Sequence, residues 1–159
     1  MTLQLTPKEK SLLEDQKKHE QICIEKYQSY ANQAQDPTLK QLFNSYAGQE
    51  QQHLNTVNQM LNGQIPNMTS QQNQQSSQST STTTPSSSQG AVANKNDSTL
   101  CTDMLMTEKF VSGAYDTAIF EFADPNVRQA LNHIQKEEQG HGQGIFQYMQ
   151  SHGMYNTQS

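Results

Sequence analysis

Six side chains in this sequence have the types and the spacing needed to bind metal ions. A glutamate is followed thirty residues later by a Glu-x-x-His motif, and this arrangement occurs twice. In each motif the carboxylate and the imidazole lie on the same face of a helix, because they are three residues apart. Mixed oxygen and imidazole donors suit iron or manganese, with zinc as a common substitute. The candidate ligands of two metal ions are Glu20, Glu50, His53, Glu108, Glu138 and His141.

Four segments with apolar residues at helical spacing must carry these ligands. The second and fourth segments begin with Asp-Pro, an N-cap acid followed by a proline at the first helical position. The second ends at Asn62-Gly63, a typical C-terminal signal. No segment shows the alternation of a β-strand, so we predict an all-α chain. The expected helices span about residues 7–34, 37–62, 98–123 and 125–151.

The sequence contains an internal repeat. Shifted by 88 positions, the first half lies on the second half without a gap. The shift places Tyr27 on Tyr115 and Asp36 on Asp124, and it pairs the six candidate ligands. Each half is therefore expected to form one helical hairpin. Because a hairpin alone would leave its apolar stripe in water, the two hairpins are expected to pack together as a four-helix bundle.

The four glutamates of the pattern interrupt apolar stripes, where core side chains are expected. Glu20, for example, lies seven residues from both Leu13 and Tyr27. Each glutamate stands about fifteen residues from the turn of its hairpin, which is roughly 22 Å at a rise of 1.5 Å per residue. All four can therefore meet in one layer of the bundle. A buried carboxylate costs several kcal/mol unless it is paired or bound to metal, so this layer favours a metal site.

A polar stretch separates the two hairpins. Residues 64–97 consist mostly of Ser, Thr, Gln, Asn and Gly, which bury too little apolar surface to offset the entropy of ordering them. We interpret the stretch as a flexible crossover linker without a site of its own; the alternative is a sticky Gln/Asn-rich assembly segment. The predicted organisation is a single bundle over residues 1–152, with hairpins at 7–63 and 98–152 and a tail at 153–159.

Composition and charge argue against several classes of function. The chain of 159 residues is 31% apolar with a net charge of −5, and it has no basic cluster to indicate a nucleic-acid partner. The sequence has no run of 18 apolar residues, so we predict no membrane span. The first residues lack the apolar region of a signal peptide, so we expect cytoplasmic synthesis without secretion. Cys23 and Cys101 form neither a CxxC motif nor a disulfide framework, and we interpret them as core residues.

The doubled pattern of the six candidate ligands resembles the ferritin-like di-iron carboxylate superfamily, notably the rubrerythrin and bacterioferritin type. The resemblance covers both hairpins and implies a ferritin-like bundle with two iron ions bridged by Glu50 and Glu138. Glu20 and Glu108 would be terminal ligands, and each histidine would bind one metal. The sequence departs from rubrerythrin because it has no CxxC…CxxC module, the usual domain for electron delivery.

A short bundle rich in Gln, with a Ser/Thr/Gln linker, is also similar to the spore coat protein F family of endospore-forming bacteria. This resemblance implies a place in the spore coat, with copies of the chain or other coat proteins as partners. The ferritin-like resemblance implies an oxidoreductase in which two iron ions react with O₂ or peroxide; manganese and zinc are the alternative metals. The alternative is a structural coat protein whose metal site is stabilising or vestigial. An iron-storing cage is less favoured, because its shell would have to accommodate the linker.

Other polar side chains have simpler interpretations. Tyr27 and Tyr115 lie one heptad from the first glutamate of each hairpin. They could hydrogen-bond a liganding carboxylate or histidine, or be core residues whose hydroxyls are satisfied elsewhere. Glu137 neighbours Glu138 but is rotated about 100° from it around the helix axis, so we expect it at the surface. The histidines off the apolar stripes or at a helix end are expected to be solvated: His19, His133 and His152.

Overall fold

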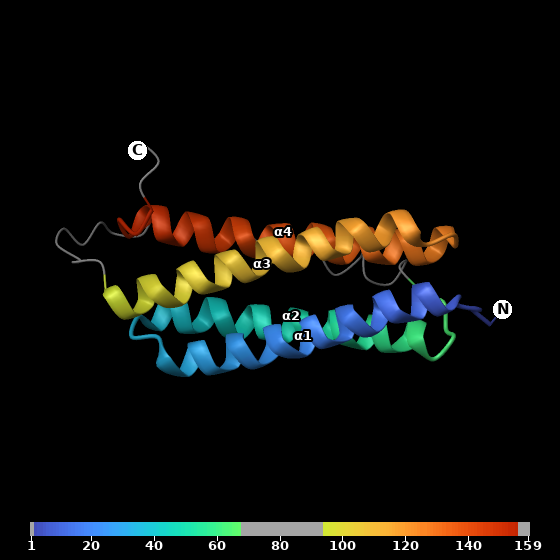
Figure 1. Ribbon diagram of the computed structural model, residues 1–159. Helices are drawn as coiled ribbons and strands as arrows, with labels where there is room; N and C mark the ends of the chain where they lie inside the picture. The colour runs from blue at the N-terminus through green and yellow to red at the C-terminus, as the bar shows by residue number, and fades with distance from the viewer. Residues whose placement is uncertain (1, 68–93, 156–159) are drawn as a thin grey trace.

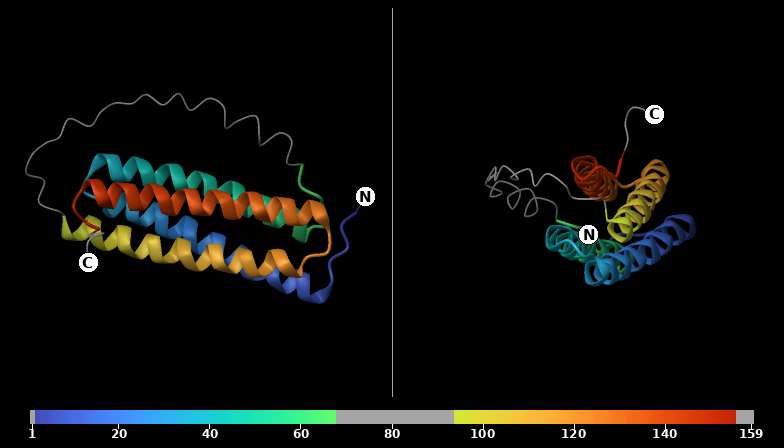
Figure 2. Two further views of the ribbon diagram at one scale, coloured as in Figure 1. Left: turned by 90° about the horizontal axis from the view of Figure 1, so that it is seen from above. Right: turned by 90° about the vertical axis from the view of Figure 1, so that its left-hand side faces the viewer.

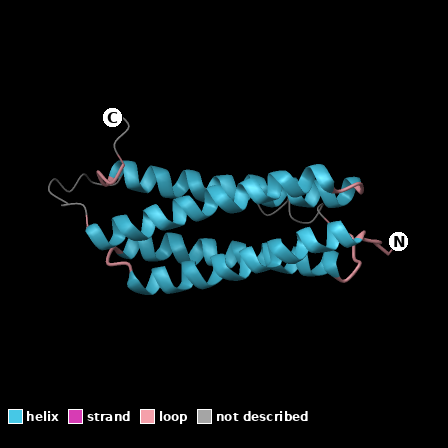
Figure 3. Cartoon of the chain, viewed as in Figure 1, coloured by secondary structure: helices cyan, strands magenta, loops and turns pink. Residues whose placement is uncertain are grey.

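Four helices and no strand make up the part of the chain that the computed structural model describes, residues 2–67 and 94–155 (Figure 1, Figure 3). The all-α prediction is confirmed. The helices pack as two hairpins, α1 with α2 and α3 with α4, which lie against each other as a four-helix bundle (Figure 2). Within the described ranges, none of the helices combines the length and hydrophobicity that a membrane span needs. Their bounds are α1 Pro7–Gln33, α2 Pro37–Leu61, α3 Lys95–Glu121 and α4 Pro125–Ser151.

Neighbouring helices run antiparallel. α1 packs on α3 and α2 on α4 across the two hairpins, and in Figure 1 each of these pairs runs in opposite directions. The end of α2 and the start of α3 lie at opposite ends of the bundle, as a crossover connection requires. Most of the predicted linker falls on residues 68–93, which lie outside the described residues.

The helix ends follow from local signals in the sequence. Thr6 begins α1 with a capping box, and Asp36 and Asp124 cap α2 and α4 directly before a proline. The chain leaves α2 and α4 through Gly63 and Gly153, whose φ angles of 79° and 68° favour glycine. The Asp-Pro starts of α2 and α4 and the end of α2 at Gly63 therefore lie where the sequence predicted them.

The start of α3 differs from the prediction. The helix begins at Lys95, three residues before the expected position, because the side chain of Asn94 accepts hydrogen bonds from the backbone of the first turn. The carboxylate of Asp97 then accepts hydrogen bonds from the backbone N–H groups of Gln35 and Asp36, at 2.9 and 3.0 Å. Residues 95–97 therefore belong to the second hairpin and fix it to the α1–α2 loop.

A matching contact fixes the first hairpin to the second at the other end of the bundle. Glu9 is the repeat equivalent of Asp97, 88 positions earlier. Its carboxylate accepts hydrogen bonds from the backbone N–H of Thr6 at 2.8 Å and from that of Ala123, in the α3–α4 loop, at 3.2 Å. The internal repeat of the sequence is thus reproduced in the tertiary contacts.

Apolar side chains fill the bundle in two clusters. One cluster lies toward the α3–α4 loop and includes Leu13 and Cys23, while the other lies toward the α1–α2 loop and includes Phe43 and Cys101. Both cysteines are buried and free, as predicted. Between the two clusters lies a buried layer of glutamate and histidine side chains.

Candidate metal centre

All four helices contribute to this buried layer. α1 and α3 each provide one glutamate, and α2 and α4 each provide a glutamate and a histidine. The exposed fraction of each side chain is between 0 and 3%. The structure thus brings together all the ligands that the sequence predicts: Glu20, Glu50, His53, Glu108, Glu138 and His141.

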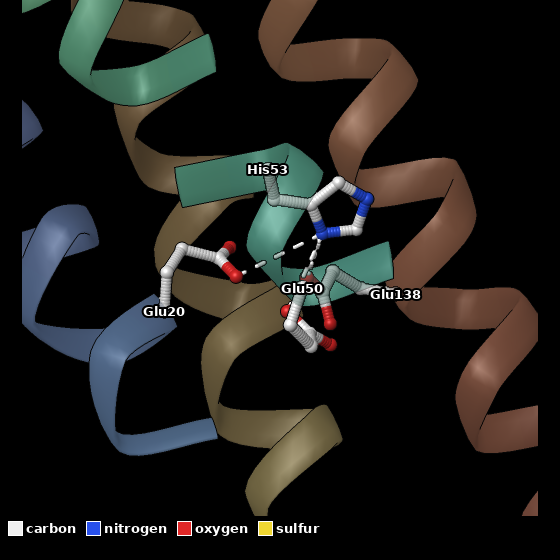
Figure 4. A group of neighbouring side chains, drawn as sticks. All are labelled: Glu20, Glu50, His53 and Glu138. Carbon is white, nitrogen blue, oxygen red and sulfur yellow. Dashed lines mark hydrogen bonds and ion pairs between the residues drawn. The ribbon is translucent and has the colours of Figure 1, made fainter. Parts of the chain in front are cut away.

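The six side chains form two overlapping groups of four. In each group, one possible ligand atom from every residue lies within 4.8 Å of those of the other three. Glu50 and Glu138 belong to both groups. The first group is Glu20, Glu50, His53 and Glu138 (Figure 4). The second group is Glu50, Glu108, Glu138 and His141.

Each imidazole reaches across to the other hairpin. Nδ1 of His53 lies 2.8 Å from Oε1 of Glu138, and Nδ1 of His141 lies 2.9 Å from Oε1 of Glu50. Figure 4 shows the Nδ1 edge of the His53 ring turned toward the carboxylates around it. The two imidazole rings are nearly parallel, with centroids 5.9 Å apart and an interplanar angle of 22°. Both Nδ1 atoms therefore face the carboxylates that the two groups share.

Two tyrosines hold the other carboxylates, again across the hairpins. The hydroxyl of Tyr115 donates to Oε1 of Glu20 at 2.5 Å, and the hydroxyl of Tyr27 donates to Oε1 of Glu108. The sequence left open whether the tyrosine hydroxyls bond the candidate ligands or are satisfied elsewhere, and these bonds favour the first interpretation. Burial and the nearby carboxylates raise the pKa of both phenols well above the ordinary value, so the hydroxyls keep their protons and act as donors.

Burial and charge shift the protonation of the layer. Burial raises the pKa of Glu50 to about 7 and that of Glu108 to about 8. Burial lowers the pKa of His141, but its hydrogen bonds to glutamates outweigh this and raise the pKa to about 12. The same balance raises the pKa of His53 well above its ordinary value. The cluster therefore binds protons at neutral pH, and metal cations could replace them.

Some polar atoms of the layer have no hydrogen-bond partner among the residues that the structure describes. They are Oε2 of Glu20, Glu108 and Glu138, and Nε2 of His53. An unpaired buried polar atom costs about 1–3 kcal/mol. Carboxylate oxygens that converge with imidazole nitrogens are typical ligands of iron and manganese, so this donor set fits two such ions.

Sequence reasoning missed two residues that contact the histidines from the opposite hairpin. Oε1 of Gln49 lies 2.5 Å from Nε2 of His141, and Oε1 of Glu137 lies 3.7 Å from Nε2 of His53. The prediction of a surface position for Glu137 was wrong, because its side chain is 21% exposed and also pairs with His133. Positions 49 and 137 are equivalent in the internal repeat, which is the signal that could have found them.

The three remaining histidines are half-buried, so they are only partly solvated. The ring of His19 packs edge-on against Phe110, with centroids 5.3 Å apart. The ring of His152 stacks on Tyr148 at 4.0 Å. These contacts lie away from the buried layer, so His19 and His152 add nothing to the candidate metal centre.

The second hairpin resembles a known protein family. Residues 96–158 match the Coat F domain. No curated protein and no solved structure matches the chain. The Coat F match includes half of the candidate ligands, Glu108, Glu138 and His141, and it supports the predicted similarity to spore coat proteins.

Proposed function

We propose that the protein is a component of the spore coat whose ferritin-like bundle binds two metal ions, with iron as the expected metal. The Coat F match supports the location. The metal site is carried by one observation, the convergence of two groups of four buried donors that share Glu50 and Glu138. The unpaired carboxylate oxygens in this layer add to the support, since a cation would satisfy them.

Each ion would have its own ligands and share two others. Glu20 and His53 would hold one ion, with Glu50 and Glu138 common to both. Glu108 and His141 would hold the other. Bound ions would neutralise the carboxylates and, as iron, would supply one-electron redox chemistry.

The surrounding side chains would orient these ligands. Tyr27 and Tyr115 donate to the carboxylates that are not shared, and each does so from the opposite hairpin. Gln49 lies against the outer nitrogen of His141, so the Nδ1 atom stays turned toward Glu50. Contacts of this kind fix the direction of a ligand and the tautomer of an imidazole.

A structural role of the ions agrees best with the Coat F match. Both groups of donors contain residues of both hairpins, so each ion would tie the hairpins together. The second candidate is a di-iron oxidoreductase that consumes O₂ or peroxide. It is favoured by the mixed oxygen and imidazole donors, which suit redox-active iron and manganese.

Metal counting tests the proposal. The purified protein is loaded with Fe(II) without oxygen, desalted and analysed for its elements, and we expect two metal ions per chain. The variant Glu50→Ala/Glu138→Ala should retain none, because both shared ligands are gone. The control variant Glu25→Ala/Glu121→Ala removes two exposed glutamates of α1 and α3 and should still bind two. Two ions per chain in the first variant would overturn the assignment.

Two further measurements separate the roles. Mixing the Fe(II)-loaded protein with O₂ or peroxide in a stopped-flow instrument should leave the iron oxidised no faster than free Fe(II) if its role is structural. Rapid oxidation that repeats after each reduction would favour the oxidoreductase. A separate experiment tests the location of the protein. The coats of purified spores are extracted from a host that expresses the tagged protein, and the protein should be present in this coat fraction. Absence of the protein from the coat fraction would contradict the coat assignment.

A further inference from the structure

A pocket of about 320 Å³ lies between α3 and α4 and reaches the candidate metal centre. Lys109 and Gln139 line it and are exposed, so they lie at its mouth. Glu108 and Glu138 also line it and are only 2% and 0% exposed, so they lie at its floor. The pocket therefore extends from the surface of the second hairpin toward two of the candidate ligands.

The floor of the pocket is suited to a cation. Oε2 of Glu108 and Oε2 of Glu138 are both buried, and neither has a hydrogen-bond partner in the described ranges 2–67 and 94–155. Buried carboxylates at the bottom of a pocket attract positive ions.

A glycine on α4 keeps the pocket open. Gly142 lines it, and a Cβ atom at this position would lie 3.9 Å from Leu105 Cδ1 and 4.0 Å from Glu108 Cβ, which are ordinary contacts. Packing therefore does not demand glycine here, although glycine disfavours a helix. Gly144 is different, because a Cβ there would clash with the hydroxyl of Tyr46. A larger side chain at Gly142 would extend into the space of the pocket, which this glycine leaves free.

The first hairpin has large side chains at the equivalent positions. The internal repeat pairs Gly142 with Leu54 and Ser112, another lining residue, with Ile24. Ile24 is buried and Leu54 is half-buried. The two hairpins are thus alike in their ligands but differ at the positions that line this pocket.

We propose that the pocket between α3 and α4 is the route by which hydrated divalent cations reach and leave the buried centre. The inference rests on the proposed metal site. It adds that the metal ions enter and leave the site through the second hairpin. A cation that enters the pocket meets Glu108 and Glu138 first. Because Glu138 belongs to both groups of donors, it can pass the ion on to the first group.

Filling the pocket tests this route. The variants Gly142→Leu and Ser112→Ile introduce the residues found at the equivalent positions of the first hairpin. Binding of Co²⁺, used as the probe, is followed by its absorbance after rapid mixing, and its removal is followed with EDTA. We expect both rates to fall at least tenfold while the final amount of Co²⁺ per chain and the dissociation constant stay unchanged. Gly140→Leu, an exposed position on the same helix where a Cβ meets nothing within 4 Å, is the matched control and should keep the wild-type rates.

A reversible block provides a second test in the event that a filled pocket disturbs folding. Ser112→Cys places a thiol in the pocket wall, where a bulky disulfide-forming reagent can attach. The native thiols of Cys23 and Cys101 are buried, and burial raises the pKa of both, so they react slowly. Attachment should slow Co²⁺ uptake, and mild reduction should restore the original rate in the same sample.

The outcomes separate this inference from the proposed function. If the wild type binds two Co²⁺ ions and the filled or blocked variants bind them at the same rate, the route is wrong and the metal site stands. If the variants lose affinity without a matching change in both rates, the pocket shapes the site instead of giving access to it, and the route is again overturned. If the wild type binds no Co²⁺, the metal site fails, and the route fails with it.

Discussion

The six buried donors impose opposite demands on the protein. Burial disfavours the charge on each carboxylate, whereas a bound cation requires that charge. The raised pKa values of Glu50 and Glu108, about 7 and 8, express this conflict. Protons and metal ions therefore compete for the same oxygens, which makes the effect of pH on stability depend on the metal.

The protein kept free of metal with a chelator should lose stability as the pH rises from about 5 to 8. Below pH 4.5, the ordinary pKa of a glutamate, folded and unfolded chains are both protonated at Glu50 and Glu108. Above it only the folded chain keeps these protons, until the pKa values of about 7 and 8 are passed. Because the folded state binds more protons in this window, the free energy of unfolding should fall by about 1–3 kcal/mol. Urea unfolding at several pH values measures the slope.

Two comparisons check the origin of this slope. Glu50→Gln removes one titrating group and should flatten the dependence on pH. Saturation with metal should reverse the sign, because the bound ligands must be deprotonated and binding then releases protons. Equal slopes with and without metal would contradict the account.

The two tyrosine hydroxyls should contribute to both stability and metal affinity. Tyr27→Phe and Tyr115→Phe each leave a buried carboxylate oxygen without its donor, so we expect a loss of about 1–3 kcal/mol in the free energy of unfolding. Metal affinity, measured by competition with a chelator, should fall about tenfold, since such supporting bonds orient the ligands. Tyr155→Phe, at a 39% exposed position outside the bundle, should change neither quantity. Equal effects at all three positions would show that the hydroxyl contacts are unimportant.

Much of the buried layer could be predicted from the sequence, and its limits have a physical reason. Glu20 and its counterparts were recognisable because a charge on an apolar stripe conflicts with burial. Gln49 and Glu137 were not, because they lie one residue before a ligand and reach a histidine only across the gap between hairpins. These contacts depend on the distance between the helices, and the apolar periodicity of a single helix gives no information on that distance.

At the scale of the helices, capping groups also serve as contacts between hairpins. The carboxylate of Glu9 closes the capping box of α1 and also binds the α3–α4 loop. Asp97 lies in the first turn of α3 and binds the α1–α2 loop. The early start of α3, capped by Asn94, places Asp97 in its first turn, where the carboxylate reaches this loop. A local sequence pattern rich in polar residues gave no sign of this tertiary bond.

Removal of either carboxylate should loosen one end of the bundle. We expect Glu9→Ala and Asp97→Ala each to lower the free energy of unfolding by about 1–2 kcal/mol, because both leave backbone N–H groups without an acceptor. The effects should add to within about 0.5 kcal/mol in the double variant, because the two contacts lie at opposite ends. Asp116→Ala, at an exposed position of α3, is the control. Unfolding in denaturant measures these free energies. A double variant that is no less stable than the control would contradict these roles.

For the whole molecule, the internal repeat explains why one site needs both halves. Each hairpin supplies two carboxylates and one histidine, and the shortest contacts between ligands, His53 to Glu138 and His141 to Glu50, run from one hairpin to the other. The sequence predicted that the ligands of the two hairpins meet in one layer, because the repeat puts equivalent residues at equal distances from equivalent turns. It did not predict the pocket beside α4, because the repeat draws attention to shared residues, whereas the pocket arises where Gly142 and Leu54 differ.

Metal removal should weaken the bundle as a unit. An ion present at about 1,000 times its dissociation constant adds roughly 4 kcal/mol of stability per site. For a chain of this size, two such sites should raise the melting temperature by about 15 °C or more. Calorimetry with metal and with EDTA measures the difference. The Glu50→Ala/Glu138→Ala variant should melt at one temperature under both conditions, and an equal shift in this variant would place the ions elsewhere.

The most direct measurement is anomalous X-ray diffraction from crystals of the metal-loaded protein, collected at the absorption edge of the added metal. The account predicts two anomalous peaks per chain in the layer between the hairpins, one near His53 and one near His141, both in contact with Glu50 and Glu138. A map without peaks in this layer, or with peaks only at surface carboxylates, would contradict it.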